Sequence, residues 1–330
     1  MAASSLFRRN LPWFISLLIL VTLAFYLLAG SLREVLYLLL KNTVLIALAS
    51  ALIAGEELLK SQRYWASAKA LGRPLRPSEA VKVHFASLGV GIVTPAFSGS
   101  LPTAASMLGD MLNLGPSEAL GLALSVTFFD SVVPALASLI VAPFLLPYSL
   151  PIVLIAVGVL VAWSALLARG PFEKIAAVIK RASGLQSVRG LVVEELLRVD
   201  PYVRLVLSNR RALPLLLTTS LTSYLIEAYS INIVVGPGLL DYLRSLSALM
   251  LSYVGGNLPT PGGVMGVEYA LALLIPKMAV VTWRASYLLV GLSALALANE
   301  VVRHYVGYST KVRNVLSGAN KIVNPSSIPA

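Results

Sequence analysis

Cysteine is absent from the 330 residues, and the only two histidines, His84 and His304, lie far apart in the chain. Without cysteine the chain forms no disulfide, no thiolate nucleophile and no zinc–cysteine site. Two isolated histidines also argue against a histidine-based metal centre, so we expect neither a metal nor another cofactor. Charge is equally scarce, because Asp, Glu, Lys and Arg make up only 12% of the residues, about half the share found in soluble globular chains.

Apolar residues are correspondingly abundant. They account for 57% of the chain, and the mean hydropathy is +0.82. This composition is typical of an integral membrane protein and excludes a soluble enzyme. The net charge of +11 is better explained by basic cytoplasmic loops beside anionic headgroups than by nucleic-acid binding, so no nucleic-acid partner is expected.

Six stretches are apolar enough to cross a bilayer, which takes about 20 residues. They are residues 11–30, 35–55, 117–143, 146–168, 212–235 and 282–303. Two further stretches, 80–114 and 244–276, are too long for one crossing and are cut near their middle by Pro, Gly and hydroxyl residues. Each of their arms has about 14 apolar residues, too few to span, so both stretches are predicted to be re-entrant helical hairpins.

The distribution of basic residues predicts the topology. Of the 26 Lys and Arg residues, 21 lie at the N-terminus, in 56–82, in 169–211 or from Arg303 onward. All four regions face the cytoplasm only if both hairpins return to the side from which they enter, as the positive-inside rule requires. We therefore predict a protein of the cell membrane whose N- and C-termini both lie in the cytoplasm. The alternative to a re-entrant hairpin is that each of these two stretches crosses the membrane fully twice, which also returns the chain to the same side.

The order of segments repeats with opposite orientation. Residues 35–143 contain a span, a hairpin and a span, and residues 212–306 contain the same series. Residues 1–34 form an N-terminal span, 146–211 a linking span with an amphipathic cytoplasmic segment, and 307–330 a cytoplasmic tail. The predicted fold is an all-α polytopic membrane protein with about six spanning helices and two oppositely oriented re-entrant hairpins. Interrupted segments at matching places of inverted halves indicate a transporter's midplane site; the alternative is that the glycines serve only close helix packing.

The most specific motif is Leu258-Pro-Thr-Pro-Gly-Gly-Val-Met-Gly-Val-Glu268. It resembles the Pro- and Gly-rich signature of the lysylphosphatidylglycerol synthase transmembrane region family, a flippase-like membrane domain. Three further features agree with this resemblance: Thr94-Pro95 followed by Gly99, Asp130 after two phenylalanines, and Arg284 with Tyr287. Together they cover roughly residues 35–305.

The resemblance implies a role in moving or handling lipids, such as aminoacylated phosphatidylglycerol or lipid-linked glycan precursors. The chain departs from the family in two respects. Ser100 stands where the family commonly has a glutamate after the first hairpin glycine. Nothing in the chain resembles the soluble aminoacyl-transferase domain, so a lysyl-lipid substrate does not carry over.

Three acids, Asp130, Glu227 and Glu268, fall inside apolar segments. Each costs on the order of 2.5–3.5 kcal/mol at the bilayer centre, so we expect them to face the protein interior. They serve either as a proton relay or headgroup contact, or as neutral hydrogen-bonding groups between helices. Arg284 and Arg244 are candidate partners, and Arg284 is expected to pair with Glu268 unless it is only an interfacial anchor.

The two hairpin tips are predicted to bind the substrate. Ser100 and Thr260 are expected to cap half-helices that begin near the membrane middle, where free N–H groups attract phosphate. The alternative is that the polar groups only satisfy the broken backbone. The predicted substrate-binding residues are Thr94, Pro95, Ser98, Gly99, Ser100, Asn257, Pro259, Thr260, Gly262, Gly263 and Arg284.

These features favour a transporter or flippase that handles a phosphate-bearing lipid, either a membrane phospholipid or a polyprenyl-phosphate-type lipid. A membrane-embedded lipid-modifying enzyme is the first alternative, but neither an activated nucleophile nor a metal-ligand cluster is evident. A non-catalytic membrane subunit of a lipid or glycan synthase is the second. A homo-oligomer is left open.

The topology can be tested by cysteine labelling, because the chain has no native cysteine. Single cysteines introduced at Ser183 and Ser317 should react with a membrane-permeant thiol reagent and not with an impermeant one added to intact cells. Labelling of either position from outside would contradict the predicted orientation.

Overall fold

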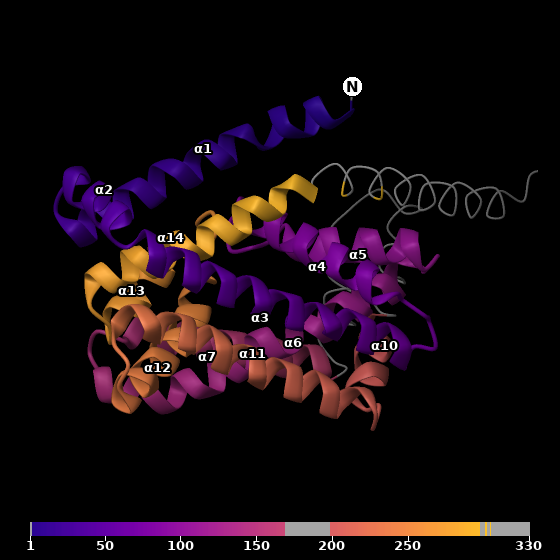
Figure 1. The fold of residues 1–330 in the computed structure, drawn as a ribbon. Helices are drawn as coiled ribbons and strands as arrows, with labels where there is room; N and C mark the ends of the chain where they lie inside the picture. The colour runs from indigo at the N-terminus through magenta and orange to yellow at the C-terminus, as the bar shows by residue number, and fades with distance from the viewer. Residues whose placement is uncertain (1, 169–198, 298–300, 302–303, 305–330) are drawn as a thin grey trace, which may run out of the picture.

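The computed structural model describes residues 2–168, 199–297, 301 and 304. The predicted cytoplasmic tail 307–330 and most of the predicted amphipathic segment 169–211 lie outside the described residues. Within the described part every regular element is helical (Figure 1), which confirms the all-α prediction. The elements are α1 (Ala2–Ala29), α2 (Leu32–Lys41), α3 (Thr43–Ala70), α4 (Pro77–Ile92), α5 (Ser100–Met111), α6 (Pro116–Val141), η1 (Ala142–Leu145), α7 (Leu150–Leu167), α10 (Val199–Leu207), α11 (Ala212–Val235), α12 (Leu239–Gly255), α13 (Gly266–Ala272), α14 (Lys277–Ala294) and η2 (Leu295–Leu297).

Long apolar helices confirm a multi-pass membrane protein. Among the described residues, the stretches Pro116–Leu145, Leu150–Leu167 and Lys277–Leu297 are long and apolar enough to cross a membrane. A fourth crossing is possible through Phe14–Ala29 and Leu32–Lys41, which meet at an angle of 90°. Length and composition thus support three or four spans, and the full set of six stays a prediction.

The predicted span 35–55 is wrong in its boundaries. Helix α2 ends at Lys41, and α3 begins at Thr43 and continues for 28 residues to Ala70. Such a helix is about 42 Å long, more than the thickness of the hydrocarbon core. The prediction stopped at residue 55 because charged residues follow, but the structure buries Glu56, Lys60 and Arg63 inside the bundle.

Lys60 and Arg63 therefore do not belong to a cytoplasmic loop as predicted. Both side chains are almost inaccessible, and they are compensated by carboxylates within the bundle. The loop that follows α3 still carries Arg73 and Arg76, whose side chains are 49% and 82% exposed.

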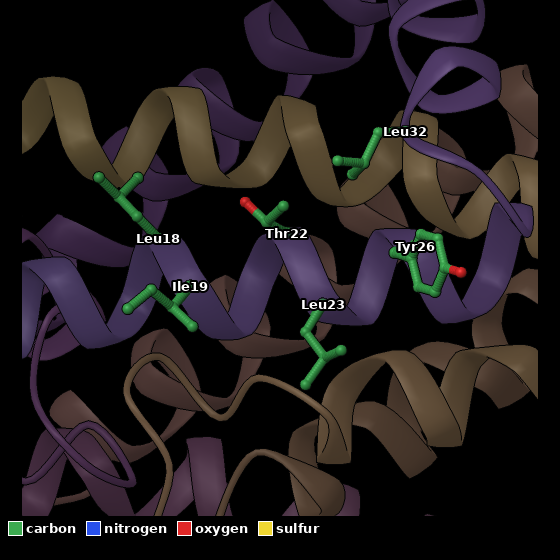
Figure 2. Close-up of a pocket in the computed structure, with 6 residues that line it drawn as sticks. All are labelled: Leu18, Ile19, Thr22, Leu23, Tyr26 and Leu32. Atoms are coloured by element: carbon green, nitrogen blue, oxygen red, sulfur yellow. The ribbon is translucent and has the colours of Figure 1, made fainter.

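The outer surface of the bundle is apolar, as contact with lipid requires. Figure 2 shows a groove on α1 and the start of α2, lined by Leu18, Ile19, Thr22, Leu23, Tyr26 and Leu32. Leu40, Val44 and Leu154 are also largely exposed. In water such a surface would promote aggregation, whereas in a bilayer it faces acyl chains.

Both predicted hairpins consist of two helices with a break between them. Helices α4 and α5 pack against each other, as do α12 and α13, and in Figure 1 the two pairs lie toward opposite ends of the bundle. Their breaks meet, because Pro95 and Pro261 form an antiparallel backbone bridge. The Ala96 N–H donates to the Thr260 carbonyl at 3.0 Å, and the Gly262 N–H donates to the Thr94 carbonyl at 3.2 Å. Re-entry into the membrane stays a prediction for both.

The predicted caps of the half-helices are wrong. Helix α5 has Gly99 at its N-cap, and the Ser100 hydroxyl donates to the Phe97 carbonyl at 2.8 Å. The Thr260 hydroxyl donates to the Val264 carbonyl at 2.5 Å, and α13 begins only at Gly266. Gly262 and Gly263 have φ angles of +58° and +63°, a conformation that no right-handed helix can contain.

Two facing glycines allow α12 and α13 to approach each other. A Cβ on Gly266 would lie 2.1 Å from the Gly255 carbonyl oxygen, and a Cβ on Gly255 would lie 2.4 Å from the Gly266 oxygen. Both clashes are with backbone, so no side-chain rotation relieves them.

Gly266→Ala should therefore destabilise the protein by about 1–3 kcal/mol or more, because backbone must move. Gly158→Ala is the matched control, since nothing lies within 4 Å of its Cβ position, and it should change stability by less than about 1 kcal/mol. The measurement is the thermal unfolding midpoint in detergent. Equal midpoints for the two variants would contradict the packing at the second hairpin.

Candidate functional site

A cavity of about 510 Å³ lies where the two hairpin tips meet α3, α6, α11 and α14. Its polar and ionisable lining comes from all these elements, so side chains far apart in the sequence converge on it. They are Glu57, Lys60, Tyr64, His84, Ser87, Ser98, Ser100, Thr127, Asp130, Ser131, Glu227, Ser252, Tyr253, Asn257, Arg284 and Tyr287.

The predicted site residues divide into two groups. Those that line the cavity are Ser98, Ser100, Asp130, Glu227, Asn257 and Arg284. The others lie beside it, in the junction of the tips or behind it: Thr94, Pro95, Gly99, Pro259, Thr260, Gly262, Gly263 and Glu268. A role in substrate binding stays a prediction for both groups.

The residues of the junction hold the broken backbone together. The Thr94 hydroxyl accepts from the Gly99 N–H at 2.9 Å. A Cβ on Gly263 would lie 2.6 Å from the Gly256 Cα, and one on Gly262 would lie 2.8 Å from the Ile92 oxygen. Since protein backbone fills the space next to these glycines, their conformation and packing already explain why no side chain is present.

Arg284 and Glu268 form the predicted ion pair. The Arg284 Nε lies 2.7 Å from Glu268 Oε1, and both side chains are buried. Arg284 Nη2 also donates to the Gly262 carbonyl at 2.6 Å, and the Met265 N–H donates to Glu268 Oε2 at 2.6 Å. The start of α13 is thus already occupied by a carboxylate of the protein. Arg244, the other candidate, is largely exposed and lies 3.6 Å from Asp241.

A cluster that the sequence analysis missed lies at one wall of the cavity. We call it the Lys60 cluster; it consists of Glu56, Glu57 and Lys60 on α3, His84 on α4, Glu227 on α11 and Tyr253 on α12.

The Lys60 ammonium is at the centre of this cluster. Lys60 Nζ lies 2.5 Å from Glu56 Oε1 and 3.5 Å from both Glu57 and Glu227. It donates to the Tyr253 hydroxyl at 2.7 Å, which in turn donates to Glu227 at 2.6 Å. One ammonium is therefore shared among three carboxylates.

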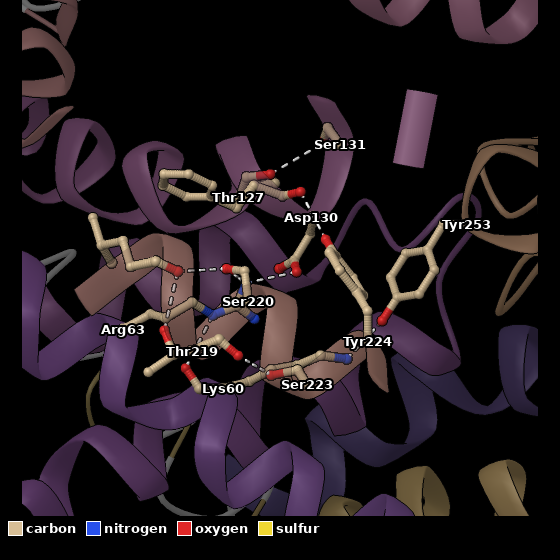
Figure 3. Close-up of polar contacts among 12 residues, drawn as sticks. Lys60, Arg63, Thr127, Asp130, Ser131, Thr219, Ser220, Ser223, Tyr224 and Tyr253 are labelled. Carbon is tan, nitrogen blue, oxygen red and sulfur yellow. Dashed lines mark hydrogen bonds and ion pairs between the residues drawn. The ribbon is translucent and has the colours of Figure 1, made fainter. Parts of the chain in front are cut away.

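Arg63 and Asp130 form a separate ion pair, in which Arg63 is buried (Figure 3). Arg63 Nη1 donates to Asp130 Oδ1 at 2.7 Å and to the Ser220 hydroxyl at 3.2 Å. Next to it, the Tyr224 hydroxyl donates to the Phe129 carbonyl at 2.7 Å. The pair connects α3 with α6 and α11, and Asp130, 29% exposed in its side chain, faces the cavity.

His84 also belongs to the Lys60 cluster. Its Nε2 lies 2.5 Å from Glu57 Oε2. A signal for the cluster was present in the sequence: Glu56, Lys60 and Arg63 follow one another at helical spacing and form the i, i+3 and i, i+4 pairs of one helix face. The sequence analysis missed this signal because it assigned residues 56–82 to a cytoplasmic loop. Among the described residues, no group of three or more His, Cys, Asp or Glu side chains is arranged to hold a metal ion.

The fold and the cavity together define the class of protein. Apolar helices with a lipid-facing surface, two broken helical hairpins and a polar cavity beside their junction characterise a multi-pass membrane protein. The family model "Lysylphosphatidylglycerol synthase TM region" matches residues 13–290. The chain therefore belongs to this family of membrane proteins of lipid metabolism. No curated protein and no solved structure matched the sequence.

Removal of Arg284 should be costly because it leaves Glu268 buried without its counter-charge. Arg284→Met is expected to lower the free energy of unfolding by about 3–5 kcal/mol. The double variant Arg284→Met/Glu268→Met should recover much of the loss, since no buried charge remains. Arg244→Met, at an exposed pair, should change stability by less than about 1 kcal/mol. If the single variant Arg284→Met were as stable as this control, the Arg284–Glu268 ion pair would not stabilise the fold as expected.

Proposed function

We propose that the protein moves a phosphate-bearing membrane lipid between the two leaflets, with its headgroup in the cavity and its acyl chains in the bilayer. One observation carries the proposal: both broken hairpins and the charged faces of α3, α6 and α11 border the same cavity of about 510 Å³. Polar cavities at the junction of broken helices are where transporters bind their substrates.

The first hairpin tip supplies the phosphate-binding groups in this proposal. Helix α5 begins at Ser100, and Ser98 and Ser100 line the cavity together with Asn257 of the opposite tip. The start of a helix carries a partial positive charge that attracts phosphate. In α5 this charge is what supports the proposal, because the Ser100 N–H already donates to the Phe97 carbonyl and Pro102 has no N–H. The start of α13 offers no such place, because Glu268 occupies it.

The two hairpins also provide the means of alternating access in this proposal. They touch through the Pro95–Pro261 bridge, which consists of two hydrogen bonds, and through the packing of Gly262 against Ile92. In this proposal these contacts break and reform. In this proposal both hairpins are re-entrant, the termini are cytoplasmic and the protein acts in the cell membrane, as the distribution of basic residues predicts.

Two acid-to-amide substitutions test the proposal in vesicles. Asp130→Asn and Glu227→Gln remove a charge from the cavity wall with little change of shape. Reconstituted unmodified protein should expose fluorophore-labelled phosphatidylglycerol of the inner leaflet to an external quencher, and both variants should lose most of this activity while remaining folded.

The control is Asp241→Asn, a change of the same chemistry at a partly exposed pair, which should behave like the unmodified protein. Full lipid movement in both cavity variants would contradict the role of these acids. No lipid movement by the unmodified protein, with labelled phosphatidylglycerol or with labelled polyprenyl phosphate, would contradict the proposed function.

A further inference from the structure

The carboxylates around the cavity differ in whether a basic side chain balances their charge. Two pairs are neutral as units: Arg63 with Asp130, and Arg284 with Glu268. The Lys60 cluster is different, because Glu56, Glu57 and Glu227 share a single ammonium. Three carboxylates against one lysine leave two negative charges that only His84 and bound protons can offset.

The excess of negative charge in the cluster is clearest at Glu56. The residue is 0% exposed, and neither of its carboxyl oxygens accepts a hydrogen bond from the residues that the structure describes. Oε1 contacts Lys60 Nζ at 2.5 Å, outside hydrogen-bonding geometry, and Oε2 is buried without a donor. The ammonium that pairs with Oε1 is shared with Glu57 and Glu227, and Oε2 lacks a donor, so a proton on this carboxyl group removes excess negative charge from the cluster.

Glu57 and His84 mark where a proton reaches the cluster. Their atoms Oε2 and Nε2 are 2.5 Å apart, so a short hydrogen bond joins the imidazole directly to the carboxyl group. Both residues line the cavity, so a proton from the cavity meets this pair before it meets Glu56. From there Lys60 contacts Glu57, Glu56 and Glu227.

Other ionisable groups face the cluster from the elements packed against it. The ionisable groups that face it are Tyr64 and Arg63 on α3, Asp130 on α6, Tyr224 on α11, and Arg284 and Tyr287 on α14. Both arginines already have carboxylate partners. A metal cation would have to displace the ammonium, since Lys60 Nζ occupies the position among the oxygens.

We propose that the Lys60 cluster is a proton-binding site, with His84 and Glu57 as its entrance, and that it couples proton uptake to occupancy of the cavity by an anionic headgroup. A phosphate brings a further negative charge to a wall that already has two in excess. A proton bound at the cluster offsets this charge, so lipid and proton cross together. The coupling rests on the proposed function, while proton binding does not.

His84→Gln is the sharpest variant. A glutamine amide can still donate to Glu57 but has no titratable proton. Glu57→Gln removes the other half of the entrance. Glu34→Gln, on the exposed face of α2, is the matched control. Gel filtration and the thermal midpoint establish that each variant is folded.

The first measurement needs no lipid movement. Infrared difference spectra of the detergent-purified protein between acid and alkaline pH should show carboxyl and imidazole bands from the cluster. These bands should change in His84→Gln and Glu57→Gln and persist in Glu34→Gln. Identical spectra in all four proteins would overturn the proton site.

The second measurement uses vesicles with labelled phosphatidylglycerol and an imposed pH difference of about one unit. If one proton crosses with each lipid, this pH difference can maintain a ratio of labelled lipid between the two leaflets of up to about tenfold. The lipid should accumulate in the leaflet that faces the alkaline side. Reversal of the gradient should reverse the asymmetry, and the ratio should fall to about one in His84→Gln.

The outcomes separate the two proposals. Lipid that equilibrates without responding to pH in the unmodified protein supports the proposed function and overturns the coupling. An asymmetry that follows a sodium gradient instead of the pH gradient also overturns it. Absence of all lipid movement contradicts the proposed function and the coupling together, and the infrared spectra then still decide whether the cluster binds a proton.

Discussion

Compensation of the charges on α3 is the interaction on which the rest of the bundle depends. A helix that carries Glu56, Glu57, Lys60 and Arg63 cannot lie in an apolar bundle unless each charge finds a partner. Lys60 pairs with Glu56 and Glu57 within α3, and the other partners come from neighbouring helices: His84 from α4, Asp130 from α6, Glu227 from α11 and Tyr253 from α12. Each contact restricts the rotation and depth of a neighbouring helix, so the cluster orients most of the elements that border the cavity.

The junction of the hairpin tips is the second constraint, and it depends on backbone chemistry. Prolines and glycines end α4 and α12 near the same place, and the freed backbone groups must be satisfied inside the protein. They bond to each other across the tips, while Arg284 donates to the Gly262 carbonyl and pairs with Glu268. Broken helices are therefore stable here because one tip supplies the hydrogen bonds that the other lacks.

Sequence reasoning succeeded where a segment's surroundings are uniform. Long apolar runs predicted the bounds of helices α6, α7 and α11 closely, including Ala212–Val235 to the residue. The breaks in both hairpins and the pairing of Arg284 with Glu268 also followed from the sequence. It failed where tertiary contacts override a local rule. The charges after residue 55 suggested a loop, because their partners lie on other helices, and positive φ angles at Gly262 and Gly263 delay the start of α13 beyond Thr260.

The ion pairs around the cavity differ in what they can do. A matched pair such as Arg63 with Asp130 is most stable with both charges present, so it holds two helices together and resists change. The Lys60 cluster has no such optimum, because one ammonium cannot satisfy three carboxylates at once. Its state depends on any charge that enters the cavity beside it, and a change there alters the contacts of α3, α4, α11 and α12 together. In the proposed transport function, the imbalance that makes the cluster costly in an apolar bundle also allows it to respond to a charged headgroup.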